Sequence, residues 1–370
     1  MSAVGGLQLA KPAGRTRPRP QFHPLRVADV QRLCEDAVAV TFDVPAELAG
    51  EYAFAPGQSV TLRRTVNGRE ERRSYSICAP AGEPPRIGVR EVPDGLFSRW
   101  LVREVRPGDR IEVQPPAGTF TPDLTTAGYH VLVAAGSGIT PVLSIAASVL
   151  AADPASQVAL LYGNRRTDTV MFADEVADLK DAHHTRMDLV HVLSREPREA
   201  ELFSGRLDGA KLRILLPLLI DVPAVDHWWL CGPFEMVTEA MAVLAAQGVP
   251  RDRIHQELFY VEDTPPEPAR HADAGVEGPS ADVTVVLDGR STPVTLPRGT
   301  TILDGAQRVR PDLPFACKGG VCGTCRARLV DGEVEMRRNF ALEQSELDAG
   351  FVLTCQSLPV SPKVTVDYDA

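Results

Sequence analysis

The feature that most constrains the fold of this chain is a group of four cysteines in its C-terminal part. Three lie in one short loop and the fourth lies thirty residues downstream; they are Cys317, Cys322, Cys325 and Cys355. The spacing C-x4-C-x2-C with a distant fourth cysteine is typical of [2Fe–2S] sites, where one loop supplies three thiolates and a later segment the last. Gly319, Gly320 and Gly323 let such a loop turn tightly without a Cβ clash. The sequence therefore predicts an iron–sulfur cluster held by these four thiols.

Two other uses of these cysteines stay open from the spacing alone. Cys322 and Cys325 could form half of a zinc site, but zinc sites usually pair two such C-x2-C steps, and the other two cysteines do not form a second one. Disulfide bonds are also possible, although three thiols in so short a stretch serve loop closure poorly. A zinc-stabilised binding module without a redox role is therefore the alternative from a different class of protein.

The residues around the cysteines predict a small α+β domain of the β-grasp type over residues 282–370. Apolar alternation and two Asp-Gly turns indicate two hairpins with one helix between them. The first hairpin joins Val283–Leu287 to Pro293–Leu296, the helix covers Thr301–Arg308, and the second hairpin joins Arg326–Val330 to Glu333–Arg337 around Asp331-Gly332.

Length and composition indicate a multidomain globular protein. A chain of 370 residues suits two or three domains, and 44% hydrophobic with 24% charged residues is an ordinary globular composition. The net charge of −10 argues against nucleic acid as a partner. No run of about twenty apolar residues occurs, so we expect no membrane partner. The three further cysteines, Cys34, Cys78 and Cys231, make the total odd, which favours a reducing cytoplasm.

Two segments have the composition of chain without a packed core. Residues 1–21 are basic and proline-rich and lack the apolar core of a signal peptide, so we expect a disordered tail. Residues 261–281 combine proline, glycine and acidic residues with almost no apolar pattern, which predicts a linker.

Residues 22–123 predict an antiparallel β-barrel, because short runs of alternating apolar and polar residues are separated by turns. The expected strands are Val38–Val44, Ser59–Arg64, Arg72–Ile77, Arg86–Val92 and Arg110–Gln114. Within them, Arg73 could bind a pyrophosphate, Tyr75 could lie against a flat ring and Ser76 could reach a ring nitrogen. Gly95 and Ser98 lie where a helix begins, and free N–H groups at a helix N-terminus bind anions. An ordinary strand with an outward arginine would explain the first motif alone; both together predict a flavin dinucleotide.

Residues 124–260 predict a doubly wound α/β domain. Continuous apolar runs of the kind found in buried parallel strands alternate with helical stretches. The expected strands are His130–Ala135, Val158–Tyr162, Leu189–Leu193 and Trp228–Cys231, and the expected helices are Pro141–Leu150, Val170–Asp181, Leu207–Leu216 and Glu235–Gln247.

The first of these strands leads into Gly136-Ser-Gly138-Ile-Thr140-Pro141, a glycine turn that enters a helix. Backbone N–H groups and the positive helix end suit a phosphate there, although the turn lacks the third glycine of the usual dinucleotide motif and could be a plain connection. At the next strand tips, Arg165, Ser194 and Arg195 favour the 2′-phosphate of NADPH, while Glu196 keeps NADH open.

Cys231-Gly232-Pro233 ends the fourth strand, at the edge where ligands of α/β sheets bind. A small thiol beside a glycine leaves room for a nicotinamide ring; a buried cysteine at a strand end is the alternative. Glu257 and Phe259 end this domain and are candidates to approach the flavin.

In this order, the Arg73-x-Tyr75-Ser76 motif, the glycine turn, Cys231-Gly232-Pro233 and the cysteine quartet resemble a ferredoxin–NADP reductase module fused to a C-terminal plant-type ferredoxin. Three further stretches are similar to the reductase subunits of ring-1,2-phenylacetyl-CoA epoxidases, although reductases of steroid and other ring hydroxylases look alike there. These stretches are Tyr162-Gly-Asn-Arg165, His191-Val-Leu-Ser-Arg-Glu196 and the tail from Asn339 to Tyr368.

The resemblance implies an oxidoreductase that passes electrons from NADPH through FAD and the [2Fe–2S] cluster to a separate di-iron oxygenase acting on phenylacetyl-CoA, or to another steroid or aromatic oxygenase. It implies that Arg73, Tyr75, Ser76, Gly95 and Ser98 hold FAD and that Gly136, Gly138, Thr140, Arg165, Ser194 and Arg195 hold NADPH. Cys231, Tyr75 and Ser76 would be the catalytic residues, with Cys231 beside the nicotinamide. No Glu-x-x-His pair on facing helices is expected, so the oxygen chemistry would belong to the partner.

Overall fold

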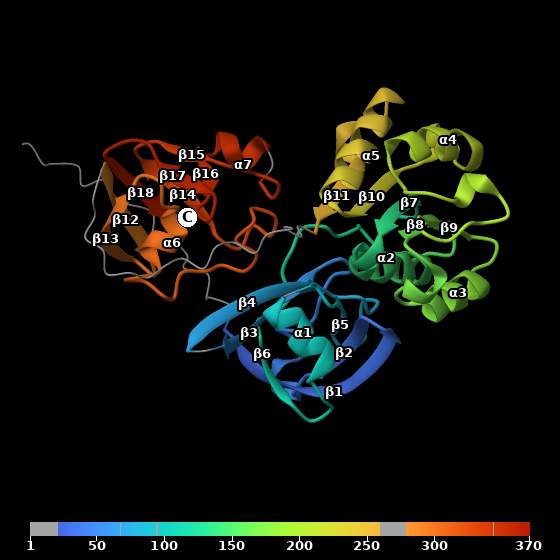
Figure 1. The fold of residues 1–370 in the computed structure, drawn as a ribbon, viewed down its shortest axis with the longest axis horizontal. Coiled ribbons are helices and arrows are strands. Elements are labelled where there is room, and N and C mark those ends of the chain that lie inside the picture. Colours follow the sequence, from blue (N-terminus) through green and yellow to red (C-terminus); the bar gives the residue numbers. More distant parts are fainter. Residues whose placement is uncertain (1–20, 67, 94, 260–278, 343) are drawn as a thin grey trace, which may run out of the picture.

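The computed structural model describes residues 21–66, 68–93, 95–259, 279–342 and 344–370. These residues form three lobes, each built around its own main sheet (Figure 1). We call them the barrel lobe (residues 21–123), the parallel lobe (residues 124–259) and the C-terminal lobe (residues 279–370). The expected tail, residues 1–21, and the expected linker, residues 261–281, lie almost wholly outside the described residues. Among the described helices, none is long and apolar enough to cross a membrane.

The barrel lobe contains six antiparallel strands in the order β4-β3-β6-β1-β2-β5. A bridge between Ile77 and Ile87 joins the two outer strands and closes the barrel around buried side chains such as Leu25, Phe42 and Leu62. The strands are β1 (His23–Cys34), β2 (Ala37–Asp43), β3 (Ser59–Val66), β4 (Arg69–Ser76), β5 (Arg86–Arg90) and β6 (Arg110–Val113), and the helices are η1 (Ala46–Leu48) and α1 (Leu96–Arg103).

One barrel strand, β1, was not predicted from the sequence. Its pairing with β2 shifts register between Val27 and Asp29 and again between Arg32 and Cys34. A bulge places an extra residue in one strand and so interrupts the period of two on which strand prediction depends. The five strands that were predicted each overlap an observed strand.

The parallel lobe contains five parallel strands in the order β11-β10-β7-β8-β9, so the strand order reverses beside β7. Helices α2 and α3 contribute to the core on one face of the sheet, and α4 and α5 contribute to the core on the other. The strands are β7 (Tyr129–Ala135), β8 (Gln157–Asn164), β9 (Met187–Leu193), β10 (His227–Gly232) and β11 (Ile254–Leu258). The helices are η2 (Gly136–Gly138), α2 (Ile139–Ala152), η3 (Thr167–Thr169), α3 (Ala173–Ala182), η4 (Glu201–Phe203), α4 (Gly209–Leu219), η5 (Val222–Ala224), α5 (Phe234–Ala246) and η6 (Arg251–Arg253).

The barrel and parallel lobes share one hydrophobic core. Ala37, Ala39 and Cys78 of the barrel lobe belong to the same buried cluster as α2. Polar contacts reinforce the junction: Nη1 and Nη2 of Arg86 each donate to an oxygen of the Glu175 carboxylate at 2.8 Å. These two lobes therefore form one packed unit.

The C-terminal lobe is an α+β fold with the main sheet order β13-β12-β18-β14-β16 and a separate pair, β15-β17. Its core includes Val283, Leu296 and Ile302. The strands are β12 (Ser280–Leu287), β13 (Arg290–Pro297), β14 (Arg326–Asp331), β15 (Val334–Met336), β16 (Phe351–Leu353), β17 (Ser357–Pro359) and β18 (Lys363–Asp367), and the helices are α6 (Ile302–Ala306) and α7 (Gln344–Asp348). Strand β12 begins inside the stretch expected to be linker.

The prediction of a second hairpin in this lobe was wrong. Strand β15 pairs with β17, whereas β14 lies between β18 and β16, so both of its edges are already paired. The Asp331-Gly332 turn does not fold the chain back on β14. At Gly332, φ is 86°, and a Cβ would lie 2.1 Å from the carbonyl oxygen of Lys363. The chain therefore crosses closely over the start of β18 at this glycine.

Candidate cofactor and cluster sites

The four cysteines of the C-terminal lobe come together in two pairs. Cys317 interacts with Cys322, and Cys325 interacts with Cys355. All are free thiols. No three metal-ligating side chains of the described residues meet as the ligands of a single ion. Two pairs of thiols suit a cluster with two irons, because each pair can bind one iron.

The backbone of the cysteine loop is shaped to point N–H groups at sulfur. Lys318, Gly320 and Gly323 have φ values of 53°, 82° and 65°, in the left-handed region that a tight loop requires. The N–H of Gly319 donates to Cys317 Sγ at 3.3 Å, and Gln356 Nε2 donates to Cys355 Sγ at 3.7 Å. The hydrogen bond from Cys322, together with backbone N–H groups, lowers the pKa of Cys317 to about 6. This favours the thiolate, the form that binds iron.

The predicted flavin residues lie on β4 and at the start of α1. The Arg73 side chain is about half exposed and is held by Glu71 at 3.1 Å, and the Tyr75 ring lies 6.2 Å from that of Phe97. Ser98 is buried; its Oγ accepts a hydrogen bond from the N–H of Val92 at 3.0 Å and lies 3.5 Å from the carbonyl oxygen of Gly95. Ser98 therefore shapes the turn that leads into α1, with Gly95 in the N-cap position.

A hydroxyl, a carboxyl and a thiol meet where the barrel lobe faces the parallel lobe. Ser76 Oγ at the end of β4 donates to Glu257 Oε2 in β11 at 2.9 Å. Glu257 is the register partner of Cys231 in β10. Burial raises the pKa of Glu257 to about 7 and raises that of Cys231 well above its usual range, so the thiol is neutral. Ser76 and Cys231 were predicted as site residues. The bond to Glu257 was not, because 181 residues separate its partners.

The glycine turn lies directly against the end of β10. A Cβ on Gly138 would lie 2.2 Å from the carbonyl oxygen of Cys231, so only glycine fits there. Gly136 has φ 55°, and its carbonyl oxygen accepts from the Tyr162 hydroxyl at 3.0 Å. Thr140 Oγ1 donates to the carbonyl oxygen of Ser137 at 3.0 Å. Two motifs that the sequence predicted separately are thus in contact.

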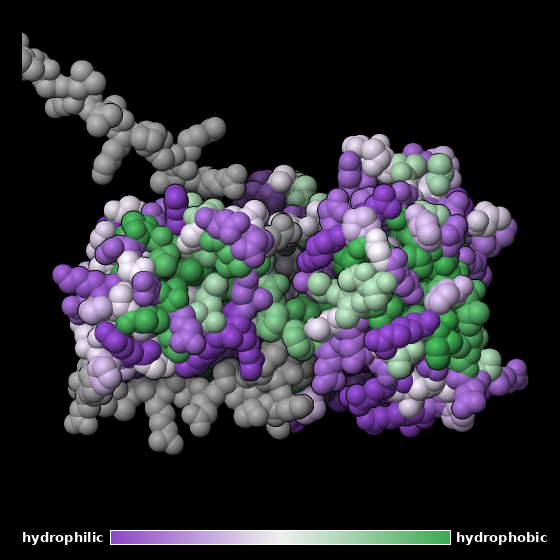
Figure 2. All heavy atoms as spheres, turned by 90° about the horizontal axis from the view of Figure 1, so that it is seen from above, coloured by the Kyte–Doolittle hydropathy of each residue, from purple (hydrophilic) through white to green (hydrophobic). Residues whose placement is uncertain are grey.

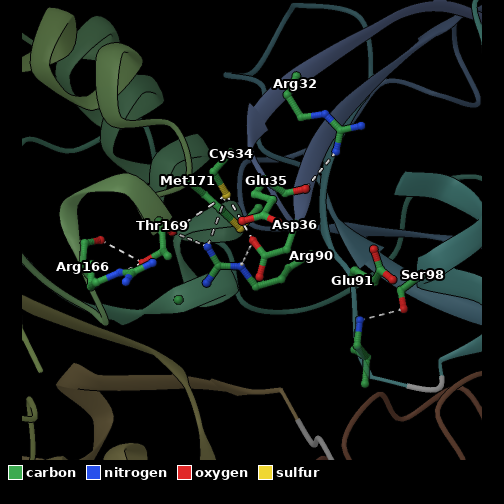
Figure 3. A network of polar contacts seen from close by, with 12 residues as sticks. Arg32, Cys34, Glu35, Asp36, Arg90, Glu91, Ser98, Arg166, Thr169 and Met171 are labelled. Atoms are coloured by element: carbon green, nitrogen blue, oxygen red, sulfur yellow. Dashed lines mark hydrogen bonds and ion pairs between the residues drawn. The ribbon is translucent and has the colours of Figure 1, made fainter. Parts of the chain in front are cut away.

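Arg90 is a cation at this turn that sequence reasoning missed. It ends β5 of the barrel, and its Nη1 is 3.4 Å from the point where a Cβ on Gly136 would lie. Figure 3 shows Arg90 directed at Cys34, Asp36 and Thr169; its Nε is 3.3 Å from Asp36 Oδ1, and its Nη2 donates to the Thr169 carbonyl oxygen. In the sequence, Arg90 is only an arginine at the end of a predicted barrel strand. Its position beside the glycine turn depends on how the barrel lobe packs against the parallel lobe, which no local pattern predicts.

The tips of β8 and β9 carry the two predicted arginines side by side. The N–H of Arg195 donates to the carbonyl oxygen of Arg165 at 2.8 Å, and both side chains are exposed. The Glu196 carboxylate accepts from the N–H and the hydroxyl of Thr167 at 2.8 and 2.7 Å, which lowers the pKa of Glu196. This acid is therefore engaged in shaping the loop, while Ser194 and the two arginines remain at the tip.

Family models match the three lobes in the expected order. An oxidoreductase FAD-binding domain matches residues 24–121, an oxidoreductase NAD-binding domain matches residues 132–241, and a 2Fe-2S iron-sulfur cluster binding domain matches residues 285–360. The chain is thus an oxidoreductase with sites for FAD, a nicotinamide dinucleotide and a [2Fe–2S] cluster, and the zinc module is excluded as an interpretation of the cysteines.

Curated relatives of the same build cover almost the whole chain. It is 42% identical to a component of the 1,2-phenylacetyl-CoA epoxidase of Escherichia coli (strain K12), over 94% of this chain and 98% of that protein. It is 35% identical to the ferredoxin reductase component of 3-ketosteroid-9-alpha-monooxygenase of Mycobacterium tuberculosis (strain ATCC 25618 / H37Rv), over 93% and 95%. The chain belongs to this family of flavin- and [2Fe–2S]-containing reductase components, whose members transfer electrons to oxygenase partners.

Solved structures show the same fold. Phthalate dioxygenase reductase, described as a modular structure for electron transfer from pyridine nucleotides to [2Fe–2S], superposes with a TM-score of 0.59 at 24% identity, over 94% of this chain and 98% of that one. An intact type IV self-sufficient cytochrome P450 monooxygenase superposes with a TM-score of 0.65 at 22% identity, over 97% of this chain but only 43% of that one.

Proposed function

We propose that this chain is the NADPH-dependent reductase of a phenylacetyl-CoA epoxidase and delivers electrons to its di-iron oxygenase subunits. The observation that carries the proposal is the 42% identity over almost the full length of both chains to the epoxidase component of Escherichia coli, against 35% for the steroid reductase. FAD, when bound, takes two electrons together from the nicotinamide and gives them up one at a time, as a [2Fe–2S] cluster requires.

The flavin site that we propose uses the barrel residues. Arg73 is exposed enough to turn from Glu71 to a pyrophosphate, which Arg binds through parallel N–H bonds. The N-terminus of α1, preceded by Gly95 and shaped by Ser98, presents free N–H groups to the same anion. Tyr75 and Ser76 hold the flat ring, and the hydrogen bond from Ser76 positions the Glu257 carboxyl group beside it.

The nicotinamide site that we propose runs along the carboxyl edge of the parallel sheet. Gly136, Gly138 and Thr140 hold the phosphates at the N-terminus of α2, where Arg90 adds a positive charge. Arg165, Ser194 and Arg195 bind the 2′-phosphate, since Glu196, the acid next to Arg195, is bonded to Thr167. Cys231, neutral and small, lies beside the nicotinamide. This arrangement supports NADPH over NADH.

The test is coupled turnover with purified candidate partners. NADPH consumption that depends on phenylacetyl-CoA, and that appears only when phenylacetyl-CoA oxygenase subunits are added, is the expected result. Coupling instead to a 3-ketosteroid oxygenase would assign the second candidate, which the 35% identical relative supports. The same assay with NADH in place of NADPH tests the cofactor preference.

We also propose that the protein works in the cytoplasm, because its seven cysteines are all free.

A further inference from the structure

The C-terminal lobe contacts both other lobes through residues that surround its cysteine loop. Phe315, two positions before Cys317, lies under the guanidinium of Arg72, with 4.9 Å between the Arg72 carbon and the ring centre. Arg72 is only 8% exposed, is paired with Glu70, and also lies 5.1 Å from the ring of Phe22. Contacts within the barrel lobe thus hold the Arg72 guanidinium in the position where Phe315 meets it.

The second contact joins the C-terminal lobe to the parallel lobe. The rings of Phe340 and Phe234 lie 5.0 Å apart, tilted by 58°. Val321, which precedes Cys322, and Phe340 both pack against the buried cluster of the parallel lobe. The N–H of Phe340 donates to the carbonyl oxygen of Gly320 at 3.1 Å, which fixes Phe340 to the cysteine loop. Figure 2 shows green apolar spheres beside purple polar ones where these two lobes approach each other.

These contacts lie over the shallow side of the cluster site. Cys317 and Cys322 are half-buried, whereas Cys325 and Cys355 are buried. Phe315 and Val321 directly flank the two shallow thiols. Electron transfer weakens steeply with distance, so the shallow pair marks the edge by which electrons enter or leave. We call Phe315, Val321 and Phe340 the docking face.

We infer that the docking face serves the flavin-bearing lobes and the oxygenase in turn, so that the two engagements exclude each other. This inference rests on the proposed function. NADPH supplies two electrons and a [2Fe–2S] cluster would carry one at a time, so the docking face would have to engage the flavin-bearing lobes twice and the oxygenase twice for each NADPH. The oxygenase surface that fits must offer what the lobes offer: a cation for Phe315 and an aromatic or aliphatic side chain for Phe340.

The contacts are of a kind that can be broken and remade. Among the residues that the structure describes, the contacts at this face include a ring pair, a cation–π contact and a valine, whereas the other two lobes share a continuous core. Contacts between domains of one chain that are small permit relative motion by default.

The experiment fixes the lobes in the docked arrangement in the holoenzyme. The double variant Phe234→Cys with Phe340→Cys is joined by a short bis-maleimide, and each single variant receives the same treatment as a control. We expect NADPH to reduce ferricyanide and to bleach the cluster spectrum in the joined protein at rates within about twofold of the single variants. Reduction of cytochrome c, which takes electrons from the cluster, should fall at least tenfold.

Three results would overturn the inference: cytochrome c reduction that survives joining, cluster bleaching that is lost on joining, or failure of the two thiols to be joined when each single variant reacts. A wild-type protein whose cluster NADPH cannot reduce would instead refute the proposed function. As a second measurement, Phe340→Ala should slow cluster reduction about twofold to tenfold, the value of one aromatic contact. Val330→Ala, at a 59% exposed valine on β14, should leave the rate unchanged, and equal effects of the two would count against the docking face.

Discussion

At the scale of single residues, the least expected feature is the buried glutamate at the junction of the lobes, Glu257. Glu257 accepts a hydrogen bond from Ser76 and is adjacent to the buried Cys231. Its pKa of about 7 lies above the unfolded value, because burial disfavours the carboxylate. The folded state therefore binds more protons than the unfolded state between about pH 4.5 and 7. Stability from this group is present below that window and is lost as the pH rises through it.

We predict that Glu257→Gln stabilises the protein at pH 8 and has little effect at pH 5. The amide keeps an acceptor for Ser76 and removes a buried charge whose cost at pH 8 is up to about 3 kcal/mol. Thermal unfolding at both pH values measures the effect. Glu235→Gln, at an exposed glutamate in the first turn of α5, controls for the change in net charge. A gain of equal size at pH 5 would show that desolvation of the carboxylate is not the cause.

At the scale of elements, a stack of rings occupies the sheet edge opposite the glycine turn. Trp229 of β10 donates to His130 Nδ1 of β7 at 3.1 Å and stacks on His255 of β11 at 4.1 Å, while His227 Nδ1 is 3.3 Å from His255 Nε2. Burial lowers the pKa of His130 and of His255 to about 4, and the neighbouring His227 adds to the shift. Histidines with lowered pKa stabilise the fold above about pH 6.5, and this contribution is lost as the pH falls toward 4.

We predict that the melting temperature falls by several degrees between pH 7 and pH 5. In this range the unfolded histidines bind protons that His130 and His255 of the folded ring stack do not, which costs roughly 2 kcal/mol after screening at partly exposed His255. The double variant His130→Gln with His255→Gln should have a shallower pH dependence over that range. His184→Gln, at an exposed histidine after α3, is the matched control. An unchanged slope in the double variant would assign the acid sensitivity to other groups.

Helices and strands could be predicted from the sequence where a local pattern of apolar residues determines them. They were harder to predict where packing between distant segments determines them. The alternating or continuous apolar runs predicted most strands of the barrel and of the parallel sheet, and the fold class of all three lobes. Strand β1 was missed because bulges break its period, and β15 was assigned the wrong partner because an Asp-Gly turn indicates a turn and not which strand follows it. Arg90 and the Ser76–Glu257 bond needed the packed lobes, since no local pattern links residues so far apart.

At the scale of the whole molecule, the three lobes are joined unequally. The barrel and parallel lobes share one core, whereas the contacts that the described residues of the C-terminal lobe make with them include Phe315, Val321 and Phe340. The expected linker, residues 261–281, lies largely outside the described residues, and its composition is that of a flexible tether.

We predict that shortening residues 261–281 slows electron delivery to the oxygenase more than hydride transfer to FAD. A shorter tether restricts the reach of the C-terminal lobe but leaves the core shared by the other two lobes intact. Stopped-flow reduction of FAD by NADPH and steady-state oxygenase turnover measure the two steps. A glycine-serine replacement of equal length is the control, and equal slowing of both steps would contradict the prediction.

The common core of the barrel and parallel lobes also decides where this protein can be re-engineered. Separating these two lobes would expose Ala37, Ala39 and the helix packed on them to water. The barrel and parallel lobes must therefore be kept together in any engineered protein. The segment after residue 259 is not bound by that requirement. Exchanging it for a different iron–sulfur carrier would change the recipient of the electrons without rebuilding their source, and this makes the chain a suitable starting point for supplying new oxidation catalysts.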